Sequence, residues 1–235
     1  MNLILLLEED FLHSDRVCLS GRRYDHIVNI HRAAVGDKLR VGLLNGLIGH
    51  GRVLSLNSDE LEIETFLDRQ PPEPLPVTLL LALPRPKMLR RILQSITSMG
   101  VKEIYLINSY RVDKSFWNSP LLQPEKLQEP LILGLEQSCD TVLPQIYLRP
   151  RFKPFVEDEL PDISSGTTAY VAHPGMGVDC PRNLRPPASL AIGPEGGFIP
   201  YEVEKLQSCS FIPINLGERI LRVETAVPVL LSRFI

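Results

Sequence analysis

Hydrophobic residues follow two different spacings along the chain, and the spacing changes near residue 70. Before that point, short apolar runs separated by turn residues occur at 2–7, 37–46, 47–56 and 60–67. Runs of this kind are typical of short strands. Asn45-Gly46 is the strongest hairpin signal, because a tight mirror-image turn needs a positive φ at both central residues. Gly49 and Gly51 indicate a bent or closely approached strand, as in a small barrel.

A proline-rich connector follows, with the sequence RQPPEPLPV at 69–77. Four of the six residues at 71–76 are proline, which predicts a stiff, extended segment. We therefore place a domain boundary here and expect a domain over residues 1–70 and a second over residues 71–235.

Apolar runs that predict strands alternate with helical patterns after the connector. The expected strands lie at 77–83, 103–108, 144–148, 167–174, 189–192 and 211–217. Helices are expected at 88–99, where Gly100 provides the stop, near 130–139, at about 200–208 and at the end of the chain. Strands that alternate with helices predict an α/β fold with a parallel sheet covered on both faces.

The composition is that of an ordinary globular protein, with 44% hydrophobic and 23% charged residues. The apolar start at Leu3–Leu7 is too short for a signal sequence, and no run is long enough to cross a bilayer. We expect a cytoplasmic protein without membrane contact. Cys18, Cys139, Cys180 and Cys209 form no C-x-x-C pair, so reduced thiols are expected and no metal site.

Charge is unevenly distributed, although the net charge of −3 argues against broad nucleic-acid affinity. Residues 16–52 carry seven Lys/Arg against two acids, and a second basic cluster, PRPKMLRR, occupies 84–91. Two such clusters favour binding of a polyanion, with a solvated surface of mixed charge as the alternative for either one. The candidate RNA-binding residues in these clusters are Arg22, Arg23, Arg32, Arg85 and Lys87.

Two sequence motifs near the carboxyl end carry most of the functional information. They are IGPEGGF at 192–198 and LGERILRVETA at 216–226, and each follows an expected strand. Ligands of open parallel sheets bind at the carboxyl ends of the strands, and glycines allow a ligand to approach the backbone. A tight loop without a ligand is the alternative for the first motif.

The first motif is neither G-x-G-x-x-G nor a G-K-[ST] loop, which argues against a nucleotide-dependent oxidoreductase. Glu195 would repel a pyrophosphate. A carboxylate suits a ligand that is cationic or donates hydrogen bonds, and S-adenosylmethionine is both. This inference favours a methyl donor as the cofactor.

Together the two motifs resemble the signature of the RsmE family, which methylates N3 of a uridine in 16S (small-subunit) ribosomal RNA. The resemblance extends through LPRPKMLRRILQSITSMGV at 83–101 and EQS at 136–138. These enzymes belong to the SPOUT class, whose chain forms a trefoil knot around S-adenosylmethionine. The resemblance implies a PUA-like β-barrel RNA-binding domain over 1–70, a SPOUT methyltransferase domain over 71–235 and a homodimer.

The resemblance also implies roles for individual residues. Arg222 and Glu224 would be catalytic and face the target base, and Arg111 would contact RNA. The cofactor would be held mostly by main-chain groups of three segments. The residues are Ala172, His173, Gly193, Pro194, Glu195, Gly196, Gly197, Leu216, Gly217, Ile220 and Leu221.

Transfer to N3 requires loss of the imide proton, because the anion is the nucleophile. The Arg222 guanidinium would stabilise negative charge on O2 or O4. Ile220 and Leu221 are expected to face adenine and core, and Glu224 with Thr225 to cap the final helix. Whether Glu224 is a base or only a cap is left open.

Some positions depart from the family pattern. Ser95 and Ser98 replace its usual lysine and glutamate, and Asp140 replaces an arginine after EQS. These changes leave two alternatives open. One is a paralogue that methylates another RNA position, and the other is a non-catalytic RNA-binding assembly factor. Trp117 is expected either to stack on a base or to anchor its loop or a dimer contact.

Overall fold

The computed structural model describes residues 2–235, and they divide into two compact units. The amino-terminal unit comprises the chain up to Glu73 together with Ile132–Leu143. The carboxyl-terminal unit comprises Pro74–Leu131 and Pro144–Ile235. The division at Glu73 lies inside the proline-rich connector, and Ile132–Leu143 adds the end of a helix to the first unit.

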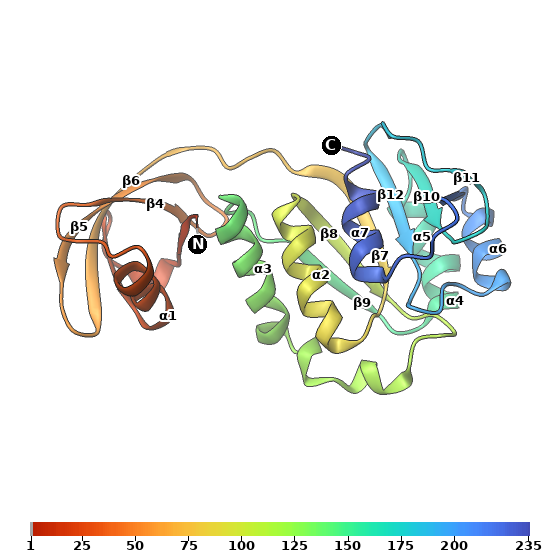
Figure 1. The fold of residues 1–235 in the computed structure, drawn as a ribbon, viewed down its shortest axis with the longest axis horizontal. Helices are drawn as coiled ribbons and strands as arrows, with labels where there is room; N and C mark the ends of the chain where they lie inside the picture. Colours follow the sequence, from red (N-terminus) through yellow and green to blue (C-terminus); the bar gives the residue numbers. More distant parts are fainter. Residues whose placement is uncertain (1) are drawn as a thin grey trace. The chain divides into compact units, whose positions relative to one another are not determined.

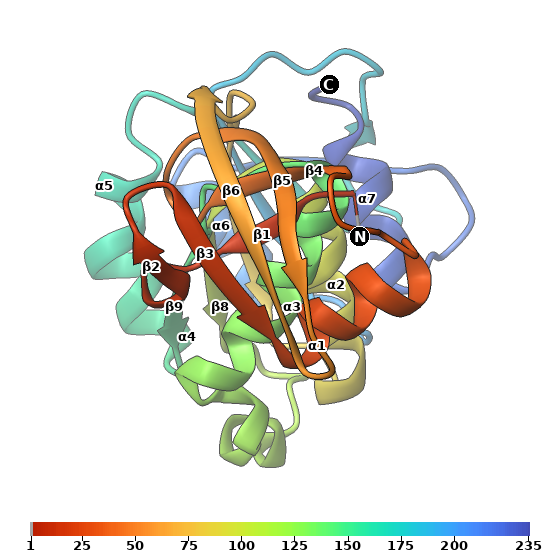
Figure 2. The same cartoon turned by 90° about the vertical axis from the view of Figure 1, so that its left-hand side faces the viewer.

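The amino-terminal unit contains a six-stranded sheet with the order β1-β4-β5-β6-β3-β2. Its strands are β1 (Ile4–Leu6), β2 (Phe11–His13), β3 (Arg16–Ser20), β4 (Lys38–Leu43), β5 (Ile48–Leu56) and β6 (Glu60–Arg69). The short helices η1 (Glu8–Asp10), α1 (Gly21–Asp25) and η2 (His26–Ile30) lie in the connections between them. β4, β5 and β6 are neighbours in this sheet (Figure 2). A core that includes Leu6, Val17, Leu19, Leu61 and Ile63 stabilises it.

The glycines of this unit behave partly as expected. A hairpin does join β4 to β5, but only Asn45, with φ of 58°, has the positive φ that both turn residues were expected to show. Close approach at the other two glycines is confirmed. A Cβ at Gly49 would lie 1.8 Å from the carbonyl oxygen of Phe66, and one at Gly51 would lie 2.3 Å from Ile63.

The carboxyl-terminal unit has a seven-stranded parallel sheet with the order β11-β13-β10-β12-β7-β8-β9, which confirms the α/β fold. Its strands are β7 (Leu75–Ala82), β8 (Val101–Ile107), β9 (Gln145–Arg149), β10 (Thr168–Ala172), β11 (Val178–Asp179), β12 (Ala188–Ile192) and β13 (Ile212–Asn215). β12 is buried along its whole length, as a central strand between two layers of helices should be.

Helices cover both faces of this sheet. They are α2 (Pro86–Ser98), α4 (Phe152–Pro154), α5 (Leu160–Ile163), α6 (Pro200–Ser208) and α7 (Val223–Leu231), with the short helices η3 (Lys114–Asn118), η4 (Pro120–Leu122) and η5 (Phe155–Glu159). α2 packs against α7, and α4 to α6 lie on the other side of the sheet (Figures 1 and 2). Gly100 has φ of 88° and ends α2 as expected.

The helix α3 (Pro124–Ser138) begins earlier than the sequence suggests. Proline favours the first turn of a helix, so Pro130 marks a plausible start near residue 130. In the structure Pro130 lies inside the helix instead. No helix among residues 2–235 is long and apolar enough to cross a membrane.

The order of the strands determines where the site forms. β10 pairs with both β12 and β13, and β12 pairs with β7, all in parallel. The segments that leave β10, β12, β13 and β7 therefore emerge at one edge of the sheet. All four of them carry residues that the sequence marks as functional.

Candidate functional site

The glycine loop, residues 193–199, follows β12 and precedes α6. A Cβ at Gly193 would lie 2.9 Å from the main-chain nitrogen of Phe198, so the loop is too tight for a side chain there. The Gly197 N–H donates to the Pro194 carbonyl at 2.7 Å, and Gly197 has φ of 72°. α6 then begins at Pro200, as expected.

A second loop, residues 216–222, joins β13 to α7 and is fixed by Asn215. The Asn215 side-chain oxygen accepts the Gly217 N–H at 2.9 Å, and Gly217 has φ of 93°. The amide nitrogen of Asn215 donates to the carbonyl oxygens of Met176 and Gly177, both at 3.4 Å. Asn215 thus holds the segments after β10 and β13 together.

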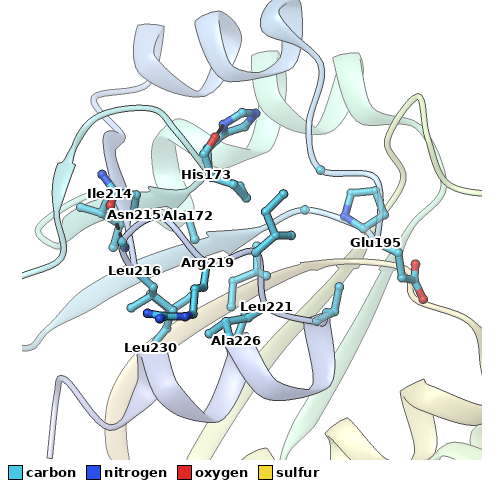
Figure 3. A pocket seen from close by; sticks show the side chains of 18 residues that line it. Ala172, His173, Glu195, Ile214, Asn215, Leu216, Arg219, Leu221, Ala226 and Leu230 are labelled. Carbon is cyan, nitrogen blue, oxygen red and sulfur yellow. Dashed lines mark hydrogen bonds between the residues drawn. The ribbon is translucent and has the colours of Figure 1, made fainter.

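These loops enclose a cavity with the start of α7 (Figure 3). Every residue expected to hold the cofactor lines it, except Gly196. The remaining lining residues are mostly apolar. They are Pro174, Ile192, Ile214, Asn215, Arg219, Val223, Ala226 and Leu230. We refer to this space as the loop cavity.

Gly196 lies outside this lining and contacts Arg111 instead. The Arg111 guanidinium donates to the Gly196 carbonyl oxygen, and a Cβ at Gly196 would lie 2.9 Å from Arg111 Cδ. Gly196 is therefore the place where the segment after β8 rests on the glycine loop.

His173 connects the segment after β10 to the glycine loop. Its Nδ1 lies 2.8 Å from the carbonyl oxygen of Pro174, and its Nε2 lies 3.2 Å from that of Phe198. Both partners are acceptors, so a neutral imidazole can donate to only one of them. Ala172, at the end of β10, also lines the loop cavity.

The carboxylate of Glu195 is directed away from the other labelled side chains of the loop cavity (Figure 3). It accepts the Arg85 N–H at 3.2 Å, and its oxygen lies 4.0 Å from Arg85 Nε. The carboxylate was expected to attract a cationic ligand, but in the structure it binds Arg85. Apart from Glu195, the lining of the loop cavity consists mostly of apolar side chains and glycines.

A second cavity adjoins the first. It is lined by Arg85, Lys87, Met88, Glu195, Ile220, Leu221, Arg222 and Glu224, of which Glu195, Ile220 and Leu221 also line the loop cavity. Because it contains three cations and two carboxylates, we call it the charged cavity. Arg222 Nη1 lies 3.9 Å from Glu224 Oε1, and the Arg222 side chain is 87% exposed.

The family described as RNA methyltransferase domain matches residues 71–235 of this chain. The ribosomal RNA small subunit methyltransferase E of Treponema pallidum is 30% identical over 96% of the chain and 87% of its own length. The chain belongs to the ribosomal RNA small subunit methyltransferase E family.

Solved structures agree with this assignment at the level of the fold. The family member from Neisseria gonorrhoeae, solved with S-adenosylmethionine, has a TM-score of 0.75 at 21% identity and covers 99% of this chain and 95% of its own. A methyltransferase from Legionella pneumophila, also solved with that cofactor, has a TM-score of 0.74 at 20% identity and covers 98% and 95%.

The residues that line the loop cavity of the present chain fit S-adenosylmethionine. Two glycine-bearing loops bring main-chain groups to the cavity, and the aliphatic residues Ile214, Leu216 and Leu230 provide an apolar surface for a nucleoside. The backbone turn at Gly193 is too tight to accept a Cβ atom.

Two expectations for the 216–226 motif are wrong. Ile220 is 80% exposed and Leu221 is 37% exposed, so both line the cavities but neither belongs to the core. Arg222 is the N-cap residue of α7 and makes no side-chain capping bond. Glu224 lies in the first turn, where a carboxylate interacts favourably with the helix dipole without capping it.

The candidate RNA-binding residues of the amino-terminal unit differ in their contacts. Arg23 donates to Asp10 and to the Leu5 carbonyl, and its side chain is only 18% exposed. Arg22 forms two bonds to the buried carboxylate of Glu136, at 2.8 and 2.9 Å. Arg32 is exposed.

The positions that depart from the family pattern have local roles. The hydroxyls of Ser95 and Ser98 donate to main-chain carbonyls of α2. Asp140 is 3% exposed and accepts the Val142 N–H at 2.9 Å, so it shapes the turn after α3. Trp117 Nε1 donates to Asn108 Oδ1 at 3.0 Å, which makes it an anchor of its own loop.

Sequence reasoning missed Asn215 in the loop cavity and Glu202 in α6. Glu202 is 3% exposed, and its two carboxylate oxygens accept the N–H groups of Ile199 and Tyr110. Asparagine at the end of a strand is a recognisable turn signal, but nothing in the sequence points to Glu202 as a bridge between loops.

Proposed function

We propose that this protein transfers a methyl group from S-adenosylmethionine to N3 of a specific uridine in 16S ribosomal RNA. The observation that carries the proposal is the adjacency of the two cavities. An apolar cavity of main-chain-rich loops shares Glu195, Ile220 and Leu221 with a charged cavity that contains Arg222. One is suited to a nucleoside cofactor and the other to a polar base.

The cofactor would be held by Ala172, His173, Gly193–Gly197 and Leu216–Leu221, and when bound it supplies an electrophilic methyl group. The protein's own contribution is to position the two reactants. The bond from the Gly217 N–H to Asn215 and the tight turn at Gly193 would restrain the two loops. Such preorganisation lowers the entropy cost of bringing the methyl group and N3 into line.

Arg222 would act on the nucleotide. Removal of the N3 proton places negative charge on O2 and O4 of the uracil ring, and a guanidinium stabilises that charge. The side chain of Arg222 is well exposed and lines the charged cavity, so it can meet a base that enters from solvent. Glu224 is the carboxylate nearest to this arginine and is a candidate acceptor for the proton.

The RNA backbone would contact Arg85 and Lys87 of the charged cavity, Arg111 beside the glycine loop, and Arg32 of the amino-terminal unit. That unit would be the PUA-like RNA-binding domain, with the boundary in the proline-rich connector. The domain over residues 71–235 would contain the trefoil knot and form the homodimer. Ribosomal RNA as the substrate favours a cytoplasmic location.

A labelling assay tests this function. Small ribosomal subunits from cells that lack the gene are incubated with the protein and S-adenosylmethionine labelled with tritium in the methyl group. We expect incorporation that nucleoside mapping assigns to 3-methyluridine. Cofactor binding without incorporation would favour a non-catalytic assembly factor, and label in another nucleoside would favour a paralogue with a different target.

A further inference from the structure

The segment after β8 presents an aromatic side chain in an unusual way. Tyr110 is 79% exposed, although aromatic side chains generally contribute most to stability when they are buried. The main chain around it is nevertheless closely restrained. We call residues 108–117 the tyrosine loop.

Bonds from several elements fix the tyrosine loop. The Asn108 N–H donates to Arg149 in β9, and the Asn108 side chain accepts the Trp117 indole N–H. The Tyr110 N–H donates to the buried carboxylate of Glu202 at 2.7 Å. The loop therefore holds an exposed ring on an ordered backbone, an arrangement that reduces the entropy cost of binding.

The tyrosine loop also rests on the glycine loop. The residue after Tyr110, Arg111, donates to the carbonyl oxygen of Gly196. Gly196 follows Glu195, which lines both the loop cavity and the charged cavity. Tyr110 thus directly precedes a residue that contacts the edge of the site, and the exposed cations Arg111 and Lys114 belong to the same loop.

We infer that Tyr110 is a stacking platform for an unpaired RNA base next to the target uridine. The inference rests on the proposed function. An enzyme that acts on N3 must reach an atom that base pairing conceals, so the target has to be unpaired or flipped out of its helix. Unpaired bases stack on exposed aromatic rings, and adjacent arginine and lysine attract the phosphates.

The test compares Tyr110→Ala and Tyr110→Phe with Ser115→Ala, a change at an exposed position of the same loop. Tyr110→Ala is expected to raise the KM for small subunits by roughly 5- to 150-fold, the effect of losing one base–aromatic stack. The kcat and the affinity for S-adenosylmethionine should change less than about twofold, because the cavities remain intact. Tyr110→Phe should behave as wild type, since stacking needs the ring and not the hydroxyl.

A second readout does not depend on turnover. A single-stranded oligoribonucleotide that contains 4-thiouridine is irradiated with the wild-type protein, and mass spectrometry should locate a crosslink at Tyr110. Absence of that crosslink, an unchanged KM for Tyr110→Ala or an equal defect in Tyr110→Phe would overturn the inference. So would a change of oligomeric state in Tyr110→Ala, which would assign the ring to an interface between copies. If wild-type protein crosslinks at Tyr110 but transfers no methyl group, the proposed function fails and the stacking site stands.

Discussion

The carboxylate of Glu202 accepts the main-chain N–H of Tyr110 at 2.7 Å and that of Ile199 at 3.0 Å. One buried side chain in the first turn of α6 therefore ties the segment after β8 to the end of the glycine loop. Both segments border the proposed site, and neither is part of the sheet. Glu202 is accordingly a positioning residue that acts through the two loops.

Glu202→Gln tests this role. Glutamine retains one acceptor oxygen but turns an NH₂ group toward the second N–H, so one buried donor loses its partner. We expect the free energy of unfolding to fall by about 1–3 kcal/mol. Displacement of the loops should also lower kcat/KM for methyl transfer by about tenfold or more.

The matched control is Glu204→Gln on the exposed side of the same helix. It should leave both stability and transfer unchanged. Denaturant unfolding and the labelling assay measure the two effects. Wild-type transfer by Glu202→Gln, despite a loss of stability, would show that the bridge has no role in positioning the site.

Much of the fold can be predicted from the sequence because burial produces regular patterns. The alternation of apolar runs with helical spacing correctly predicts the parallel sheet, and Gly100 correctly predicts the end of α2. Elements with weak patterns were missed. β11 has two residues, both exposed, and pairs only with β13, so no hydrophobic signal marks it.

The composition of the loop cavity could also be predicted, since glycines after strands mark places where ligands meet backbone. The partners of charged groups could not. Glu195 binds Arg85, which is 110 positions away in the sequence. Arg23 is a surface cation by composition, yet the fold brings Asp10 and the Leu5 carbonyl to it. Such pairs depend on tertiary contacts that periodicity does not encode.

Gly193→Ala is expected to impair cofactor binding. A methyl group at this position would lie 2.9 Å from the Phe198 nitrogen and 3.2 Å from Gly197, and both neighbours are backbone atoms that can move only if the loop moves. We expect the Kd for S-adenosylmethionine to rise at least about tenfold, or about 1.4 kcal/mol, by calorimetry.

Gly166→Ala provides the control for this substitution. Gly166 has φ of 74° with open space around its Cα, so alanine there introduces backbone strain of about 1 kcal/mol without obstructing a cavity. The free energy of unfolding of the Gly166→Ala variant should fall, while its affinity for S-adenosylmethionine should equal that of the wild type. Equal affinities for the two variants would mean that the turn at Gly193 does not shape the cavity.

Alanine substitutions at Arg22 and Arg32 should distinguish a structural role from a role in RNA binding. Arg22→Ala removes two bonds from Glu136, whose side chain is 2% exposed. Because the Arg22 side chain is itself 53% exposed, we expect a moderate loss, about 1–3 kcal/mol in the free energy of unfolding. Arg32→Ala should leave stability unchanged and weaken binding to ribosomal RNA in a salt-dependent way.

A double-mutant cycle with Glu136→Gln checks the pair. The double variant should be less destabilised than the sum of the single variants, because no unpaired carboxylate remains. Strictly additive effects in denaturant unfolding would contradict the coupling. Stability loss in Arg32→Ala would likewise contradict its assignment as a free surface cation.

Arg222→Ala is the most direct test of the proposed chemistry. Its guanidinium lines the charged cavity but not the loop cavity, so the residues that would hold the cofactor stay in place. We expect methyl transfer to fall by about 100- to 1,000-fold, the typical cost of losing one group that stabilises a developing negative charge. Calorimetry should find the affinity for S-adenosylmethionine within a few-fold of wild type.

Arg222→Lys adds a matched comparison, because it keeps the positive charge and loses the planar fork of donors. Partial activity in this variant would indicate that charge on the uracil ring is stabilised mainly through space, whereas activity as low as in Arg222→Ala would indicate directed hydrogen bonds to O2 or O4. If Arg222→Ala instead abolished cofactor binding, the arginine would belong to the cofactor site, and the division of labour between the two cavities would be wrong.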